Sequence, residues 1–135
     1  MTEISGACLC GDVSFVSGGE IKMIINCHCN DCQKVTGSVH GTMVFVEEDK
    51  LEVHGVTREF QHPADSGNTL TKIFCPNCGS QLMGKNTGRQ GVIGLRAGAL
   101  DQKDVIQPGL NIFCDSAVPS TPMSNEVKQF PKMPG

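Results

Sequence analysis

Eight cysteines in a chain of 135 residues, and the clustering of seven of them, constrain this sequence more than any other feature. The clusters are two pairs and one triple: Cys8 and Cys10 in CLCG, Cys27, Cys29 and Cys32 in CHCNDC, and Cys75 and Cys78 in CPNCG. Cysteines this close in sequence are awkward as structural disulfides, whereas a metal ion favours thiolates that lie close together. The pattern therefore predicts metal binding, with zinc as the expected ion.

Counting thiolates divides the clusters into two kinds of site. The first and last pairs together supply four thiolates, which is a closed, structural zinc site. The triple leaves one coordination position open, as zinc enzymes do to admit water or substrate. Zinc held by three thiolates would keep an incoming thiol ionised at neutral pH. We therefore expect two zinc ions per chain, and the three-ligand site is the one expected to be partly empty in a purified sample.

Spacing alone leaves open whether Cys114 or a histidine completes the triple, which would make both sites structural. Cys114 lies on the apolar alternation of segment 110–114, so we expect it to be a small buried residue of a strand. His28 lies between two ligands and is expected to point away from the metal, as a structural or solvent-facing side chain. The remaining histidines are expected at the surface: His40, His54 and His62.

The pattern of apolar residues predicts a mainly β protein with one short helix. Segments with alternating or β-branched residues are expected to be strands: 12–16, 21–26, 39–47, 51–54, 58–61, 69–74, 91–95 and 110–114. The helix is expected over 31–36, with Asn30 as N-cap and Gly37 in the left-handed conformation after its end. Its first turn would carry Cys32.

Length and composition favour one soluble domain. Four of the seven prolines fall in residues 119–135, so we expect an extended, non-regular tail that packs on the domain or trails from it. The net charge is −3 and no basic stripe occurs, so nucleic acid is not an expected partner. No leader or long apolar run is visible, which predicts a cytoplasmic protein without membrane contact. Five cations could each meet a ligand carboxylate, and the sequence does not choose among them: Lys34, Arg58, Lys72, Arg89 and Arg96.

The order of several motifs resembles one known family. CxCG is followed by CHCxxC with a lysine and a GS dipeptide (Gly37, Ser38), then by FCPxCG at 74–79, and finally by a DS dipeptide at 115–116. This order, from about Gly6 to Pro119, is similar to the glutathione-dependent formaldehyde-activating enzyme family, which includes the centromere protein V type domain.

The resemblance implies a fold, an activity and a ligand set. The fold would be a β-tent of coiled antiparallel sheets, with the zinc domain at residues 1–118. The activity would be that of a carbon–sulfur lyase, which joins glutathione and formaldehyde reversibly to give S-hydroxymethylglutathione. The structural zinc ligands would be Cys8, Cys10, Cys75 and Cys78, and the catalytic zinc ligands would be Cys27, Cys29 and Cys32.

The chain departs from the family at one position, because it has no tryptophan and reads DSAVPSTP where the family commonly carries one. The identity of the thiol and of the aldehyde therefore stays open. In an enzyme, His28 or Ser38 would stabilise or protonate the developing alkoxide. The alternative is a non-catalytic binding module with two structural zinc sites. A third hypothesis is a redox switch in which Cys29 and Cys32 form a disulfide when zinc leaves.

Overall fold

The computed structural model describes residues 3–134, which form two β-sheets, one α-helix and four short 3-10 helices. The smaller sheet has the order β1-β2-β5, with β1 at Ile4–Ala7, β2 at Ser14–Ser17 and β5 at Leu51–His54. The larger sheet has the order β11-β10-β3-β4-β9-β8-β7-β6. Its strands are β3 (Ile21–Cys27), β4 (Gly41–Glu47), β6 (Arg58–Pro63), β7 (Thr69–Phe74), β8 (Gln81–Asn86), β9 (Val92–Arg96), β10 (Leu110–Ile112) and β11 (Lys128–Gln129). The helices are α1 (Asn30–Thr36), η1 (Glu48–Lys50), η2 (Ala97–Ala99), η3 (Lys103–Val105) and η4 (Cys114–Ser116).

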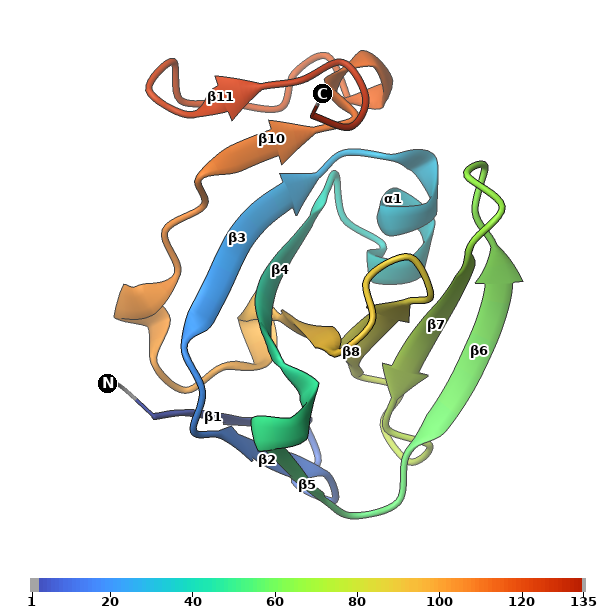
Figure 1. Ribbon diagram of the computed structural model, residues 1–135, viewed down its shortest axis with the longest axis vertical. Helices are drawn as coiled ribbons and strands as arrows, with labels where there is room; N and C mark the ends of the chain where they lie inside the picture. The colour runs from blue at the N-terminus through green and yellow to red at the C-terminus, as the bar shows by residue number, and fades with distance from the viewer. Residues whose placement is uncertain (1–2, 135) are drawn as a thin grey trace.

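Most neighbouring strands are antiparallel, and β10 differs because it pairs in parallel with both β3 and β11. The large sheet spreads open, with β10 and β11 on one side, β6 and β7 on the other, and α1 between the two arms (Figure 1). The small sheet lies across the base of this arrangement (Figure 1). The prediction of a mainly β fold with one short α-helix is confirmed for residues 3–134.

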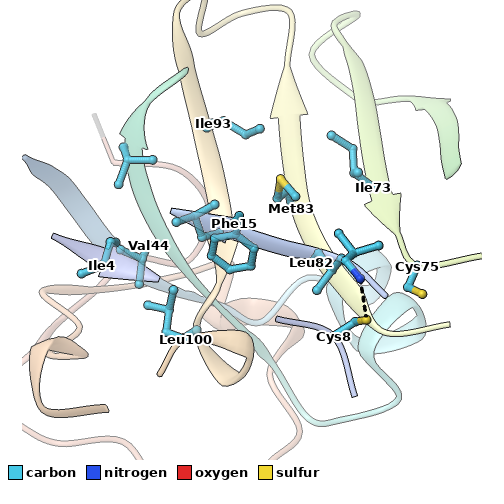
Figure 2. Packing of buried hydrophobic residues seen from close by; sticks show 14 of the residues in the cluster. Ile4, Cys8, Phe15, Val44, Ile73, Cys75, Leu82, Met83, Ile93 and Leu100 are labelled. Atoms are coloured by element: carbon cyan, nitrogen blue, oxygen red, sulfur yellow. Dashed lines mark hydrogen bonds between the residues drawn. The ribbon is translucent and has the colours of Figure 1, made fainter. Parts of the chain in front are cut away.

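Strands β3 and β4 are buried on both faces, because consecutive residues of a strand point to opposite sides. Ile24 and Val44 belong to the main core, which they share with Phe15 of the small sheet and with Leu82 of β8 (Figure 2). The next residue of β3 and the preceding residue of β4 enter a second, smaller core, which also contains Ile112 and packs against Phe113 and Phe130. The larger sheet therefore separates two apolar cores.

Three strands were not expected from the sequence: β1, β8 and β11. β1 reads ISGA and β8 reads QLMGKN, so glycine and polar residues interrupt the alternation that identifies a strand. β11 has two residues and lies within the tail that was expected to lack regular structure. Its strand character comes from pairing with β10 rather than from local sequence.

The helix lies where the sequence predicts it, but its cap differs. The N-cap is Cys29, not Asn30, and Cys29 Sγ accepts a hydrogen bond from the Cys32 amide at 3.3 Å. A sulfur acceptor thus takes the place of the expected amide side chain at the cap. Gly37 has the predicted left-handed backbone, with φ of 71°, and its amide donates to the Gln33 carbonyl at 2.9 Å.

Candidate metal centres and the adjoining pocket

The first cysteine cluster joins the two sheets. Cys8 and Cys10 lie between β1 and β2 of the small sheet, and Cys75 and Cys78 lie between β7 and β8 of the large one. Their four Sγ atoms lie within 4.8 Å of one another. The separations Cys8–Cys10 and Cys10–Cys75 are 3.6 and 3.8 Å, close to the roughly 3.8 Å expected between sulfurs that bind zinc tetrahedrally. The cluster could therefore hold a metal ion.

Backbone and hydroxyl groups support the ionised form of these thiols. The Val13 amide donates to Cys8 Sγ at 3.3 Å (dashed in Figure 2). The pKa of the Cys78 thiol is lowered to about 5, first by a hydrogen bond with the Ser80 hydroxyl and then by the Ser80 amide. Gly79, between them, has a φ of 77° that favours glycine. Amide groups of the CPNCG turn thus face the sulfurs, as a thiolate site requires.

The second cluster is local. Cys27 ends β3, Cys29 caps α1 and Cys32 lies in the first turn of that helix, and their Sγ atoms lie within 4.8 Å of one another. Cys27 and Cys32 are buried in the second core, and Cys29 is half-buried. Hydrogen bonds with the Cys27 thiol, and then with the Cys32 thiol, lower the pKa of Cys29 to about 2. Cys29 is therefore the first of the three to ionise.

Within residues 3–134, no further His, Asp, Glu or Cys ligand atom joins this group of three. Cys114 belongs to neither cluster, and the prediction that it is a buried residue of a strand is wrong. β10 ends at Ile112 because Phe113 adopts a left-handed backbone with φ of 55°. Cys114 then begins η4 and is half-buried. Among the described residues, the second cluster thus offers three ligands.

His28 and Ser38 differ in their surroundings. His28 is only 1% exposed, which excludes the solvent-facing alternative, and its Nε2 donates to Asn111 Oδ1 at 2.9 Å. Its ring centroid lies 4.9 Å from that of His40. Ser38 is exposed after the end of α1, and its amide donates to Thr36 Oγ1 at 3.0 Å.

A pocket of about 730 Å³ lies between the two clusters. Cys8 and Cys78 contribute to one wall, and Thr36 and Gly41, beside Cys32, contribute to another. Its volume is in the usual range for sites that bind small molecules. The polar side chains that line it come from several elements: His40, Gln81, Arg96 and Lys103.

Sequence reasoning missed two of these residues. His40, expected at the surface, is half-buried, and burial lowers its pKa, with the proximity of His28 adding to this effect. Arg96 ends the apolar strand β9 and is only 6% exposed. A cation directly after the buried run VIGL is the one signal that could have separated Arg96 from the other four cations.

Comparisons with known proteins agree with this description. No α- or 3-10 helix in residues 3–134 is long and apolar enough to cross a membrane. No curated protein matches the chain significantly. A crystal structure of a Rhodobacter sphaeroides protein is similar in fold, with a TM-score of 0.58 and 18% identity, covering 77% of this chain and 96% of that one. The model of the glutathione-dependent formaldehyde-activating enzyme family matches residues 3–116. Since this match includes both cysteine clusters and the pocket, the chain belongs to the glutathione-dependent formaldehyde-activating enzyme family.

Proposed function

We propose that the protein is a zinc-dependent carbon–sulfur lyase that joins a thiol, glutathione, to a small aldehyde, formaldehyde, and also catalyses the reverse reaction. One observation carries this proposal beyond the family relationship. The cluster of Cys27, Cys29 and Cys32 offers three ligands among the described residues and lies beside a pocket large enough for a small molecule. A binding module with two closed sites has no need of that combination.

The donor sets suit the two roles that zinc would have. The four-thiolate cluster fits a structural ion, because its sulfur separations match a tetrahedral site and it ties two sheets together. The three-thiolate cluster would hold the catalytic ion. A zinc ion there would supply an open coordination position that favours the ionised form of the substrate thiol.

The chain's own residues would then orient the thiol and handle the proton. The thiol sulfur forms a bond to the aldehyde carbon, the carbonyl electron pair moves to oxygen, and the thiol proton ends on that oxygen. His40 is the best-placed donor, because it lines the pocket, whereas Ser38 and His28 are not among the lining residues. Its lowered pKa keeps the imidazole neutral at pH 7, so one ring N–H can donate to the developing alkoxide. His28, fixed by Asn111, would hold the His40 ring in position.

The test compares Cys29→Ser with Cys114→Ser, a half-buried cysteine outside both clusters. The rate of adduct formation from glutathione and formaldehyde is measured above the uncatalysed background, together with zinc content. We expect Cys29→Ser to lose the acceleration while it retains about one zinc ion per chain, and Cys114→Ser to keep both. Undiminished acceleration by Cys29→Ser would contradict the proposal.

A further inference from the structure

We propose that Arg96 binds a carboxylate of the thiol substrate inside the pocket, so that this site selects thiols that carry a carboxylate. The inference rests on the proposed function, since it concerns the substrate of the same site. It assigns a specificity role to a residue that the sequence could not distinguish from four other cations.

The first observation is that the charge of Arg96 is buried without a partner. The side chain is 6% exposed, and within residues 3–134 its Nε and Nη1 atoms are buried and make no hydrogen bond. None of the ion pairs formed by the described residues includes it. Burying a guanidinium is costly unless an anion and hydrogen-bond acceptors compensate it. The fold therefore maintains a cation that requires an acceptor from outside the chain.

The second observation is the direction of this charge. Arg96 lines the pocket together with His40 and Gln81, and both of these also have a buried polar atom without a partner among the described residues, His40 Nδ1 and Gln81 Oε1. Three polar side chains from different elements thus converge on one cavity. Convergent polar groups in a mostly apolar pocket are what fixes the orientation of a small ligand.

The third observation is the distance to the second cysteine cluster. A Cβ atom built on Gly41 would lie 2.7 Å from Arg96 Nη1 and 3.6 Å from Cys32 Cβ. The guanidinium and Cys32 thus approach the same glycine. A ligand whose carboxylate contacts Arg96 would have the rest of its chain next to the three thiols, so one small molecule could engage both.

Charge balance alone accounts for less of this geometry, and so does the second cation of the pocket. Neutralising the three thiolates needs no donors directed at the pocket, whereas the guanidinium of Arg96 carries five donors in a fork that matches a carboxylate. Lys103, which also lines the pocket, is exposed, and its Nζ already donates to the Gly98 carbonyl at 2.7 Å. Arg96 is therefore the cation with unused donors.

The test measures the affinity of the zinc-loaded full chain for glutathione and for glutathione diethyl ester, whose two carboxylates are blocked, by isothermal titration calorimetry. Wild type should bind the acid at least about tenfold more tightly than the ester, the usual size of a buried charged hydrogen bond. Arg96→Met should bind both with the affinity of the ester. Arg96→Lys should fall between, because it keeps the charge and loses the fork. Lys103→Met is the matched control and should behave as wild type.

Gly41→Ala gives a second variant in case Arg96→Met does not fold. It would displace the guanidinium without removing it, and it should lower the preference for the acid while leaving affinity for the ester unchanged. A wild type that does not discriminate, an Arg96→Met that keeps the preference, or a Lys103→Met that loses it would each overturn the inference. Failure of the proposed function would appear differently, as a wild type that binds glutathione yet does not accelerate adduct formation.

Discussion

Gly6 shows how one residue determines where the two sheets can meet. It lies in β1, forms an antiparallel bridge with Leu100, and approaches η2 directly after β9. A Cβ atom at this position would lie 2.3 Å from the Ala99 carbonyl oxygen and 2.5 Å from Phe15 Cζ. Neither neighbour can yield easily, because one is backbone and the other is a fully buried ring of the main core. The close approach therefore requires glycine.

Gly6→Ala should lower the free energy of unfolding by roughly 1–3 kcal/mol, the usual cost of overpacking a core. Gly109→Ala is the matched control, because a Cβ there meets nothing within 4 Å, and its effect should stay within about 1 kcal/mol. Urea unfolding at a fixed zinc concentration measures both. Equal stability of the two variants would show that β1 and η2 are not packed as described.

At the scale of elements, the two cysteine clusters have different mechanical roles. The first connects the β1–β2 loop to the β7–β8 turn, which belong to different sheets and lie far apart in sequence. The second lies within six residues and fixes only the angle between β3 and the first turn of α1. A metal that cross-links distant segments restricts the unfolded chain far more than one that closes a short loop. The first cluster should therefore account for most of the metal-dependent stability.

Cys10→Ser should accordingly lower the Tm by on the order of 10 °C, whereas Cys29→Ser should lower it by much less. Cys10 is the suitable ligand to change, because it is exposed and its loss leaves the core packing intact. Cys114→Ser controls for the loss of a thiol that binds no metal. Calorimetry of the zinc-loaded proteins gives the order, and a Cys29→Ser that melts as low as Cys10→Ser would contradict it.

The sequence predicted local features of these elements better than the features that depend on tertiary contact. CxC and CxxC spacings bring sulfurs together whatever the surrounding fold, so the structure groups the same four and the same three cysteines. The cap of α1 was displaced by one residue because a thiol replaced Asn30 as the acceptor. β8 was missed because its pairing with β7, not its alternation, makes it a strand.

On the scale of the whole molecule, each cysteine cluster lies at the border of its own apolar core. Cys8 and Cys75 pack in the main core, and Cys27 and Cys32 pack in the second one, across the large sheet. The pocket lies between them, lined by residues from α1, the loops of the first cluster and the segment after β9. Because these segments meet only after folding, neither the pocket nor the burial of Arg96 and His40 could be predicted from the sequence.

The division of labour between the clusters is the central claim, and an absorption titration of the cobalt-substituted protein with glutathione tests it most directly. Cobalt(II) reports the number and geometry of thiolate ligands through its charge-transfer and ligand-field bands. We predict that two cobalt ions bind, that glutathione changes the bands of one of them saturably, and that Cys29→Ser abolishes this change. Two tetrahedral cobalt ions whose bands do not respond to glutathione would contradict the claim that the second site has an exchangeable position for the substrate thiol.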